Sequence, residues 1–116
     1  MKYLEYHVES KNISSSNWNK SNRNKVNASQ QQTEFITKGI DRFLTDHFKN
    51  KKGCMLGYLV NGTLDEVLIK VNLKIESKKS SNEIITLTNL VVYEHQIFQS
   101  IHSERTLKHL FFDFVN

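Results

Sequence analysis

Glu9 and Lys11 stand two residues apart in an alternating stretch, residues 3–11, and together they could hold a divalent cation and a phosphate. In a strand, successive side chains point to opposite faces of the sheet. One face then carries Tyr3, Glu5, His7, Glu9 and Lys11, and the other, which we expect to be buried, carries Leu4, Tyr6 and Val8. Metal-dependent nucleases use a carboxylate as a Mg²⁺ ligand and a lysine to stabilise charge on phosphate. The spacing therefore predicts phosphodiester chemistry.

Such a site needs a second carboxylate, and the chain has almost nothing before this strand that could supply one. On the same predicted face, Glu5 and His7 are the candidate extra ligands for a Mg²⁺ ion held by Glu9. The tripeptide itself is not distinctive, because residues 76–78 repeat the Glu-Ser-Lys of residues 9–11, and there we expect only a helix end and a turn. The alternative to chemistry is an edge strand whose solvated face carries charged side chains.

The elements that would position this pair begin with a helix predicted over residues 31–49. Its apolar side chains recur at three- and four-residue spacing, and they are Phe35, Ile36, Ile40, Phe43, Leu44 and Phe48. Gly39 lies on the same face, and a glycine there marks a close approach of the helix to the sheet. Lys38 and Arg42 fall on the polar face.

The rest of the chain alternates between strand and helix patterns. The apolar run 54–60 predicts a central strand, and a second amphipathic helix follows from Thr63 to Ile75. Residues 84–93 predict a β-branched strand, a loop rich in His and Ser comes next, and residues 107–115 predict a final strand. The order β-α-β-α-β-β indicates an α/β fold with a small mixed sheet and helices packed on it.

Residues 12–30 are polar and lack periodicity, so we expect a long loop. Lys20, Arg23 and Lys25 make it basic, which suits contact with nucleic acid. Trp18 is its main apolar residue. It either stacks on a base or folds back over the edge of the core, and we favour the second.

Composition limits the function classes. A chain of 116 residues predicts a single domain, residues 1–116, and a net charge of +4 is compatible with a polyanionic partner. No apolar run reaches the length of a membrane span and no signal-peptide pattern opens the sequence, so we expect a cytoplasmic protein without membrane contact. The single cysteine, Cys54, stands in an apolar run and is predicted to be a buried thiol rather than a nucleophile.

Two further clusters offer alternatives. His102, His109 and Asp113 could form a zinc site, although ordinary hydrogen-bonding histidines are the stronger interpretation. The final strand carries Phe111, Phe112 and Phe114, more aromatic surface than one small core readily buries. An exposed remainder would bind a protein partner or a second copy of the chain.

Several short segments together resemble the restriction-endonuclease-like, or PD-(D/E)xK, superfamily of phosphodiesterases, and in particular its uncharacterised bacterial members. The matching segments are residues 6–11, 35–43, 53–58 and 100–114. The resemblance implies Mg²⁺-dependent hydrolysis of nucleic acid on a sheet flanked by helices. It makes Glu9 a metal ligand and Lys11 the catalytic lysine. Because the helix after this strand often supports the site, it also makes Lys38 and Arg42 phosphate contacts.

The chain departs from the pattern of that superfamily at its beginning. The strand that normally brings the metal-binding Asp, and an amino-terminal helix, have no counterpart here. Glu5 or His7 could replace the Asp, a second chain could supply it, or the protein is a degenerate relative that binds without cutting. The resemblance thus implies a nuclease, or a degenerate relative of one, from a defence or mobile-element system. The alternative is a non-catalytic binding or inhibitor protein, such as an anti-defence protein or a partner subunit, on the same scaffold.

Overall fold

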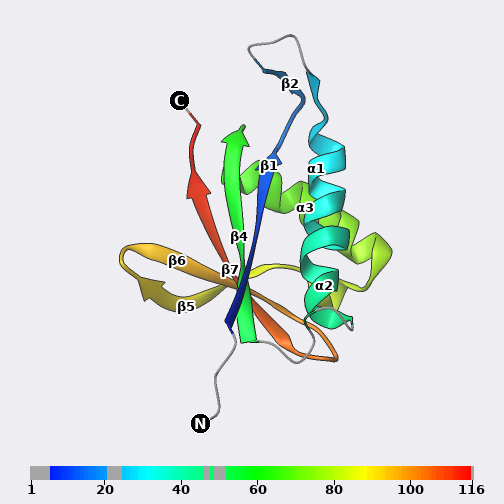
Figure 1. The fold of residues 1–116 in the computed structure, drawn as a ribbon, viewed down its shortest axis with the longest axis vertical. Coiled ribbons are helices and arrows are strands. Elements are labelled where there is room, and N and C mark those ends of the chain that lie inside the picture. The colour runs from blue at the N-terminus through cyan, green and yellow to red at the C-terminus, as the bar shows by residue number, and fades with distance from the viewer. Residues whose placement is uncertain (1–5, 21–24, 46–47, 49–51, 116) are drawn as a thin grey trace.

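The computed structural model describes residues 6–20, 25–45, 48 and 52–115, and a five-stranded mixed sheet forms its centre (Figure 1). The strands lie in the order β1-β4-β7-β6-β5. β1, β4 and β7 are parallel, whereas β6 runs antiparallel to both of its neighbours. Their bounds are β1 (Tyr6–Ser14), β4 (Lys52–Asn61), β5 (Thr86–Val92), β6 (His95–Ile101) and β7 (Thr106–Asp113). The predicted α/β class with a small mixed sheet is confirmed.

β6 is the strand that the predicted order β-α-β-α-β-β lacks. Its residues lie in the segment that was expected to be a loop rich in His and Ser, and His95, Gln96, Gln99 and Ser100 dilute its apolar pattern. The hairpin turn that precedes β6 also lacks the usual sequence signal. Tyr93 and Glu94 adopt positive φ angles of 50° and 66° there, whereas the usual sequence signal for two such residues is Asn-Gly or Asp-Gly.

The helices cover one face of the sheet. The first helical segment consists of α1 (Ala28–Phe35), a π-helical turn η1 (Ile36–Ile40) and α2 (Asp41–Leu44), and it is followed after β4 by α3 (Leu64–Lys78). Asn27 and Thr63 cap α1 and α3, because each side chain accepts a hydrogen bond from an amide of the first turn. The segment 76–78 ends α3 as predicted. A single turn of 3-10 helix, η2 (Ser81–Glu83), leads to β5.

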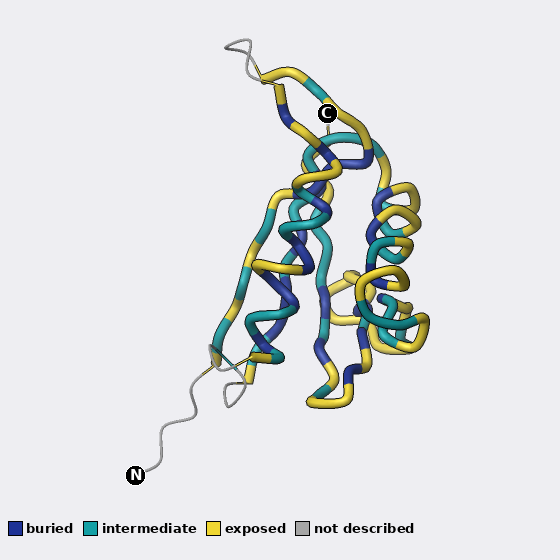
Figure 2. The backbone as a smooth tube through the Cα atoms, turned by 90° about the vertical axis from the view of Figure 1, so that its right-hand side faces the viewer, coloured by how far each residue is buried: buried dark blue, intermediate teal, exposed yellow. Residues whose placement is uncertain are grey.

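The core lies between these helices and the sheet, and Figure 2 shows the buried sides of α1 and α3 turned inward. Its fully buried members are mainly the apolar residues whose spacing predicted the helices and β4, including Phe35, Ile36, Ile40, Phe43, Met55, Leu59, Val67, Val71 and Ile75. Cys54 is buried and free, as predicted. Among the described helices, none has the length and apolar composition that a membrane crossing requires.

The prediction for the two faces of β1 was wrong. Tyr6 and Val8, expected inside, are 65% and 46% exposed, and the polar face is turned toward the helices. The reason is the length of the strand. β1 continues to Ser14, so Ile13, on the same face as Glu9, is completely buried and determines which face turns inward.

The predicted loop over residues 12–30 is shorter in the structure. β1 contributes its first three residues and α1 its last three, and between them a small ribbon pairs β2 (Trp18–Asn19) with β3 (Lys25–Val26). Trp18 is half-buried and its Nε1 donates a hydrogen bond to Ser14 Oγ at 3.0 Å. This indole therefore folds back onto the end of β1, as we favoured, instead of standing free for base stacking.

Candidate functional site

Glu9 lies in the middle of β1, beneath the helical segment that follows this strand, with a side chain that is 12% exposed. Three side chains contact its carboxylate, and two of them, Lys11 and Arg42, are cationic. Lys11 Nζ lies 3.3 Å and Arg42 Nη1 3.1 Å from Oε1, and His7 Nε2 lies 3.0 Å from Oε2. The structure thus brings together four of the residues that the sequence predicted for the site, Glu9, Lys11, His7 and Arg42.

The π-helical turn η1 contributes to this arrangement. A π-helical turn adds a residue to the helix, and such turns occur frequently at functional sites. Here it places Gly39 so close to the sheet that a Cβ atom would lie 2.4 Å from Met55 Cε and 3.9 Å from Lys11 Cγ. The predicted close approach at Gly39 is confirmed. Arg42, in the next turn, can then reach Glu9 from α2.

Aromatic rings hold the other end of the site. The imidazole of His7 stacks on Phe48, with ring centroids 3.8 Å apart, and meets Phe43 edge-on at 5.9 Å. Phe43 is completely buried, whereas the His7 side chain keeps 32% of its surface exposed. The imidazole is therefore fixed in orientation and still reachable from solvent.

The electrostatics of the cluster favour the ionised form of Glu9. Burial by itself would raise the pKa of this carboxyl, but hydrogen bonds from His7 and Lys11 and the charges of Lys11 and Arg42 outweigh burial. The pKa of Glu9 consequently lies below its usual value. A single carboxylate held among cationic groups leaves the site with an excess of positive charge.

The donor set of this cluster does not fit Mg²⁺. This ion takes oxygen ligands, usually one or two carboxylates, and both oxygens of Glu9 already contact other side chains. No three acidic, histidine or cysteine side chains gather as a metal site among the described residues. Glu5, the other predicted ligand, lies outside them, and His7 contacts Glu9 itself. β1 is an edge strand, and among the described strands only β4 pairs with it.

The predicted nucleic-acid contacts fall into two groups. Arg42 and Lys38 lie on the helical segment above β1, where Lys38 pairs with Glu34 at 3.4 Å. Lys20 and Lys25 are exposed beside the small ribbon, beyond the opposite end of β1 from His7. Arg23 lies outside the described residues. One basic surface therefore contains Lys38 and Arg42 but not the ribbon lysines.

The alternative prediction of a zinc site at His102, His109 and Asp113 is wrong. The two histidines belong instead to a hydrogen-bonded chain. Glu83 Oε1 lies 2.7 Å from His102 Nδ1, His102 Nε2 lies 2.7 Å from Ser100 Oγ, and this hydroxyl lies 2.8 Å from His109 Nε2. Asp113 is exposed at the far end of β7. Glu83 and Ser100 were not predicted to contact the histidines, because nothing in their spacing along the sequence links them to His102 or His109.

Searches of protein-family models, curated proteins and solved structures found no match to this chain.

Proposed function

We propose that this protein binds the phosphodiester backbone of nucleic acid at the Glu9 cluster, as a degenerate relative of the restriction-endonuclease-like nucleases that does not cut on its own. The observation that carries the proposal is the composition of the cluster. Lys11 and Arg42 bring two positive charges to one carboxylate, which His7 also contacts, so positive charge exceeds negative charge at a partly exposed surface.

The geometry supports phosphate as the ligand. Arg and Lys are the side chains that most often bind phosphate, and Arg42 keeps guanidinium N–H groups that Glu9 does not use. The Arg42 side chain is 39% exposed. The phosphodiester backbone of a nucleic acid that runs along the helical segment could therefore contact Arg42 first and Lys38 next. Glu9 holds the cationic side chains in place before the ligand arrives, which lowers the entropic cost of binding.

Hydrolysis is the competing function. It would require a second carboxylate beside Glu9 from outside the described residues, for example from another chain that adds a strand to the free edge of β1. Glu9 would then become a Mg²⁺ ligand and would have to exchange its cationic partners for the metal ion. Binding without cutting needs no such rearrangement, and for this reason we prefer it.

The substitution Glu9→Gln separates these two functions. For a phosphate-binding site, the neutral amide removes the negative charge that competes with phosphate, and we expect nucleic acid to bind about two- to tenfold more tightly. For a hydrolytic site, the same change removes a metal ligand and abolishes cleavage. Binding is measured by fluorescence anisotropy with labelled DNA and RNA duplexes at several salt concentrations, and cleavage by gel assay with Mg²⁺ or Mn²⁺.

The matched control is Glu76→Gln, because Glu76-Ser77-Lys78 has the sequence of the site tripeptide at the exposed end of α3. It should leave affinity unchanged. The double variant Lys11→Ala, Arg42→Ala should weaken binding and lower the salt slope by about 2 for duplex DNA. Metal-dependent cleavage that is lost in Glu9→Gln would replace the proposal with the hydrolytic function. Absence of salt-dependent binding would reject both functions.

A second candidate function is assembly through the uncovered face of the sheet. The helices pack on the opposite face, and Leu56, Tyr58, Leu110 and Phe112 lie side by side on this one by strand register. Tyr58 also contacts Phe114, which is 61% exposed. Exposed apolar surface of this kind marks an association site. A second copy of the chain would present the same four uncharged side chains on its own sheet. Two such sheet faces can pack against each other as the two sheets of a β-sandwich do.

A further inference from the structure

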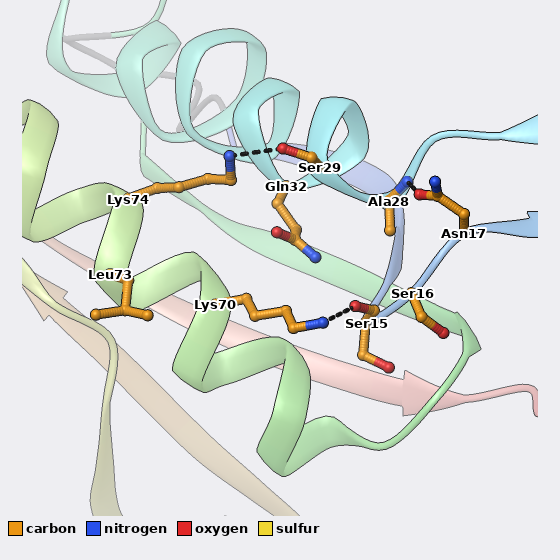
Figure 3. Close-up of a pocket in the computed structure, with 9 residues that line it drawn as sticks. All are labelled: Ser15, Ser16, Asn17, Ala28, Ser29, Gln32, Lys70, Leu73 and Lys74. Atoms are coloured by element: carbon orange, nitrogen blue, oxygen red, sulfur yellow. Dashed lines mark hydrogen bonds between the residues drawn. The ribbon is translucent and has the colours of Figure 1, made fainter.

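A pocket of about 500 Å³ lies at the end of β1, away from the Glu9 cluster (Figure 3). Its walls are Ser15 after β1, Ser29 and Gln32 on α1, and Lys70, Leu73 and Lys74 on α3. The pocket is separate from the Glu9 cluster, because Ser15 is six residues farther along β1, roughly 20 Å in an extended strand. Its volume is in the usual range for sites that bind small molecules.

Two ammonium groups dominate the chemistry of this pocket. Lys70 Nζ donates to the carbonyl oxygen of Ser15, and Lys74 Nζ donates to Ser29 Oγ at 2.9 Å. Both side chains extend from α3, Lys70 toward Ser15 after β1 and Lys74 toward Ser29 on α1 (Figure 3). An ammonium has three N–H donors, so each lysine keeps two for a ligand. No acidic residue lines the pocket, and neither lysine has a carboxylate partner in the described part of the chain.

Stability does not account for this pair. Like charges four residues apart on a helix repel one another and destabilise it by a few tenths of a kcal/mol. Lys70 and Lys74 have this spacing on α3. Two unneutralised lysines that share one concave surface are instead suited to an anion, which would offset their repulsion.

The position in the fold also suits a ligand. In open α/β sheets, ligands bind beyond the carboxyl ends of the parallel strands. β1 ends at Ser14 and the pocket begins at Ser15. The first turn of α1 forms another wall, and the amino-terminal end of a helix carries partial positive charge.

Ser15 joins the pocket through its backbone, because its carbonyl oxygen accepts the hydrogen bond from Lys70. The residue is 1% exposed, and its hydroxyl has no hydrogen-bond partner among the described residues. The hydroxyl lies where a side chain on Gly62 would be, because a Cβ atom there would come within 1.6 Å of Ser15 Oγ. Gly62 has a φ angle of +88°, which favours glycine. The Ser15 hydroxyl therefore packs against Gly62, and what Ser15 contributes to the Lys70 contact is its carbonyl oxygen.

We propose that this pocket binds a phosphate-bearing small molecule, whose phosphate is held by Lys70, Lys74 and the hydroxyl of Ser29. Leu73, which is 61% exposed at the pocket, offers an apolar surface to the organic part of the ligand. The inference is independent of the nucleic-acid site at Glu9.

The test is a titration of the full chain followed by ¹H–¹⁵N NMR. The probes are inorganic phosphate, adenosine monophosphate and, as the uncharged counterpart, adenosine, each up to about 10 mM, above the millimolar affinity expected of a weak site. Both phosphate probes should shift the amides of Ser15, Ser29 and Gln32 in a saturable manner, and adenosine should not. Tighter binding of the nucleotide than of inorganic phosphate would identify a phosphomonoester as the ligand, and equal binding would identify free phosphate.

Lys74→Ala should weaken binding of both probes about tenfold, because it removes a charge-assisted hydrogen bond. Lys74→Arg should retain binding. Lys78→Ala, in the last turn of the same helix, is the matched control and should change nothing. Among the described residues, Lys74 hydrogen-bonds only to the Ser29 hydroxyl, so its loss leaves the Lys70 contact with the Ser15 carbonyl in place. Shifts that do not saturate, shifts centred on Lys11 and Arg42, or equal affinities of Lys74→Ala and Lys78→Ala would overturn the proposal.

Discussion

Glu83, His102, Ser100 and His109 form a hydrogen-bonded chain from a partly exposed carboxylate to a completely buried imidazole. His109 packs beside the rings of Phe35 and Phe111, and its Nδ1 has no partner in the described part of the chain. Burial, and then the charge of His102, lower the pKa of His109 to about 3. The hydrogen bond from His102 lowers the pKa of Glu83.

Both shifts make the fold less stable in acid. The folded state leaves His109 unprotonated down to about pH 3, whereas the unfolded chain protonates this imidazole below about pH 6.5. The unfolded state therefore binds more protons as the pH falls between these values, and stability decreases. Glu83 acts in the same direction, because its contribution is present above the ordinary pKa of a glutamate and is lost as the pH falls through its lowered folded value.

We therefore expect the free energy of unfolding to fall with pH below about 6.5, with His109 contributing at most about 1.4 kcal/mol per pH unit. His109→Gln should reduce that slope, because the amide does not titrate. Urea unfolding at pH 7, 6 and 5 measures it. His95→Gln, at an exposed position of β6, is the control for removal of an imidazole. A slope in His109→Gln equal to that of the wild type would contradict the assignment.

At the level of elements, the parallel pair β1 and β4 determines the geometry of the Glu9 cluster. Gly53 of β4 pairs with His7 of β1. A Cβ atom at Gly53 would lie 1.8 Å from the His7 carbonyl oxygen and 2.8 Å from the ring of Phe43. At Gly39 the nearest atom is instead Met55 Cε, the flexible end of a side chain. A Cβ atom added at Gly53 would therefore collide with backbone, whereas one added at Gly39 would collide only with a flexible side chain.

Gly53→Ala should consequently destabilise the protein by about 1–3 kcal/mol, because backbone and a buried ring must move. Gly39→Ala should cost less, since Met55 can change rotamer and alanine favours helix by about 1 kcal/mol. Denaturant unfolding of both variants tests the comparison. If Gly39→Ala proved the more damaging of the two, the packing described between η1 and β4 would be wrong.

On the scale of the whole molecule, the described helices all lie on one face of the sheet, and none of them covers the other face (Figure 1). Antiparallel sheets often leave one face in water, but sheets with parallel strands usually have both faces covered. Here three strands are parallel, and Leu56, Tyr58, Leu110 and Phe112 remain partly exposed.

If a second copy covers this face, the mass in solution will be twice the 13.6 kDa of one chain, as measured by light scattering. Leu110→Lys, in the centre of the face, should then give the monomer mass, because burying an unpaired ammonium is costly. Ile69→Lys, at a position of α3 that is 63% exposed, should leave the mass unchanged. If the wild-type chain is monomeric at all concentrations, the proposed dimer is rejected.

Local patterns predicted most of the elements. Helical spacing identified the apolar faces of the first helical segment, mainly in η1 and α2, and of α3, and runs of apolar residues identified β4, β5 and β7. The positions of Glu9 and Lys11 on one face of a strand, with Arg42 on the following helix, also came from local sequence. These predictions succeeded because the periodicity of a helix or strand depends on neighbouring residues.

The sequence by itself determined which side chains share a face, and only the tertiary structure decided where each face points. Ile13 turned the charged face of β1 inward, because burying one isoleucine side chain is worth about 2 kcal/mol and the cations could satisfy Glu9. Likewise, Ser15, Ser29, Lys70 and Lys74 come from three separate segments, and nothing local links them. Contacts between segments distant in the chain depend on packing of the whole molecule, and such packing leaves no periodic trace in the sequence.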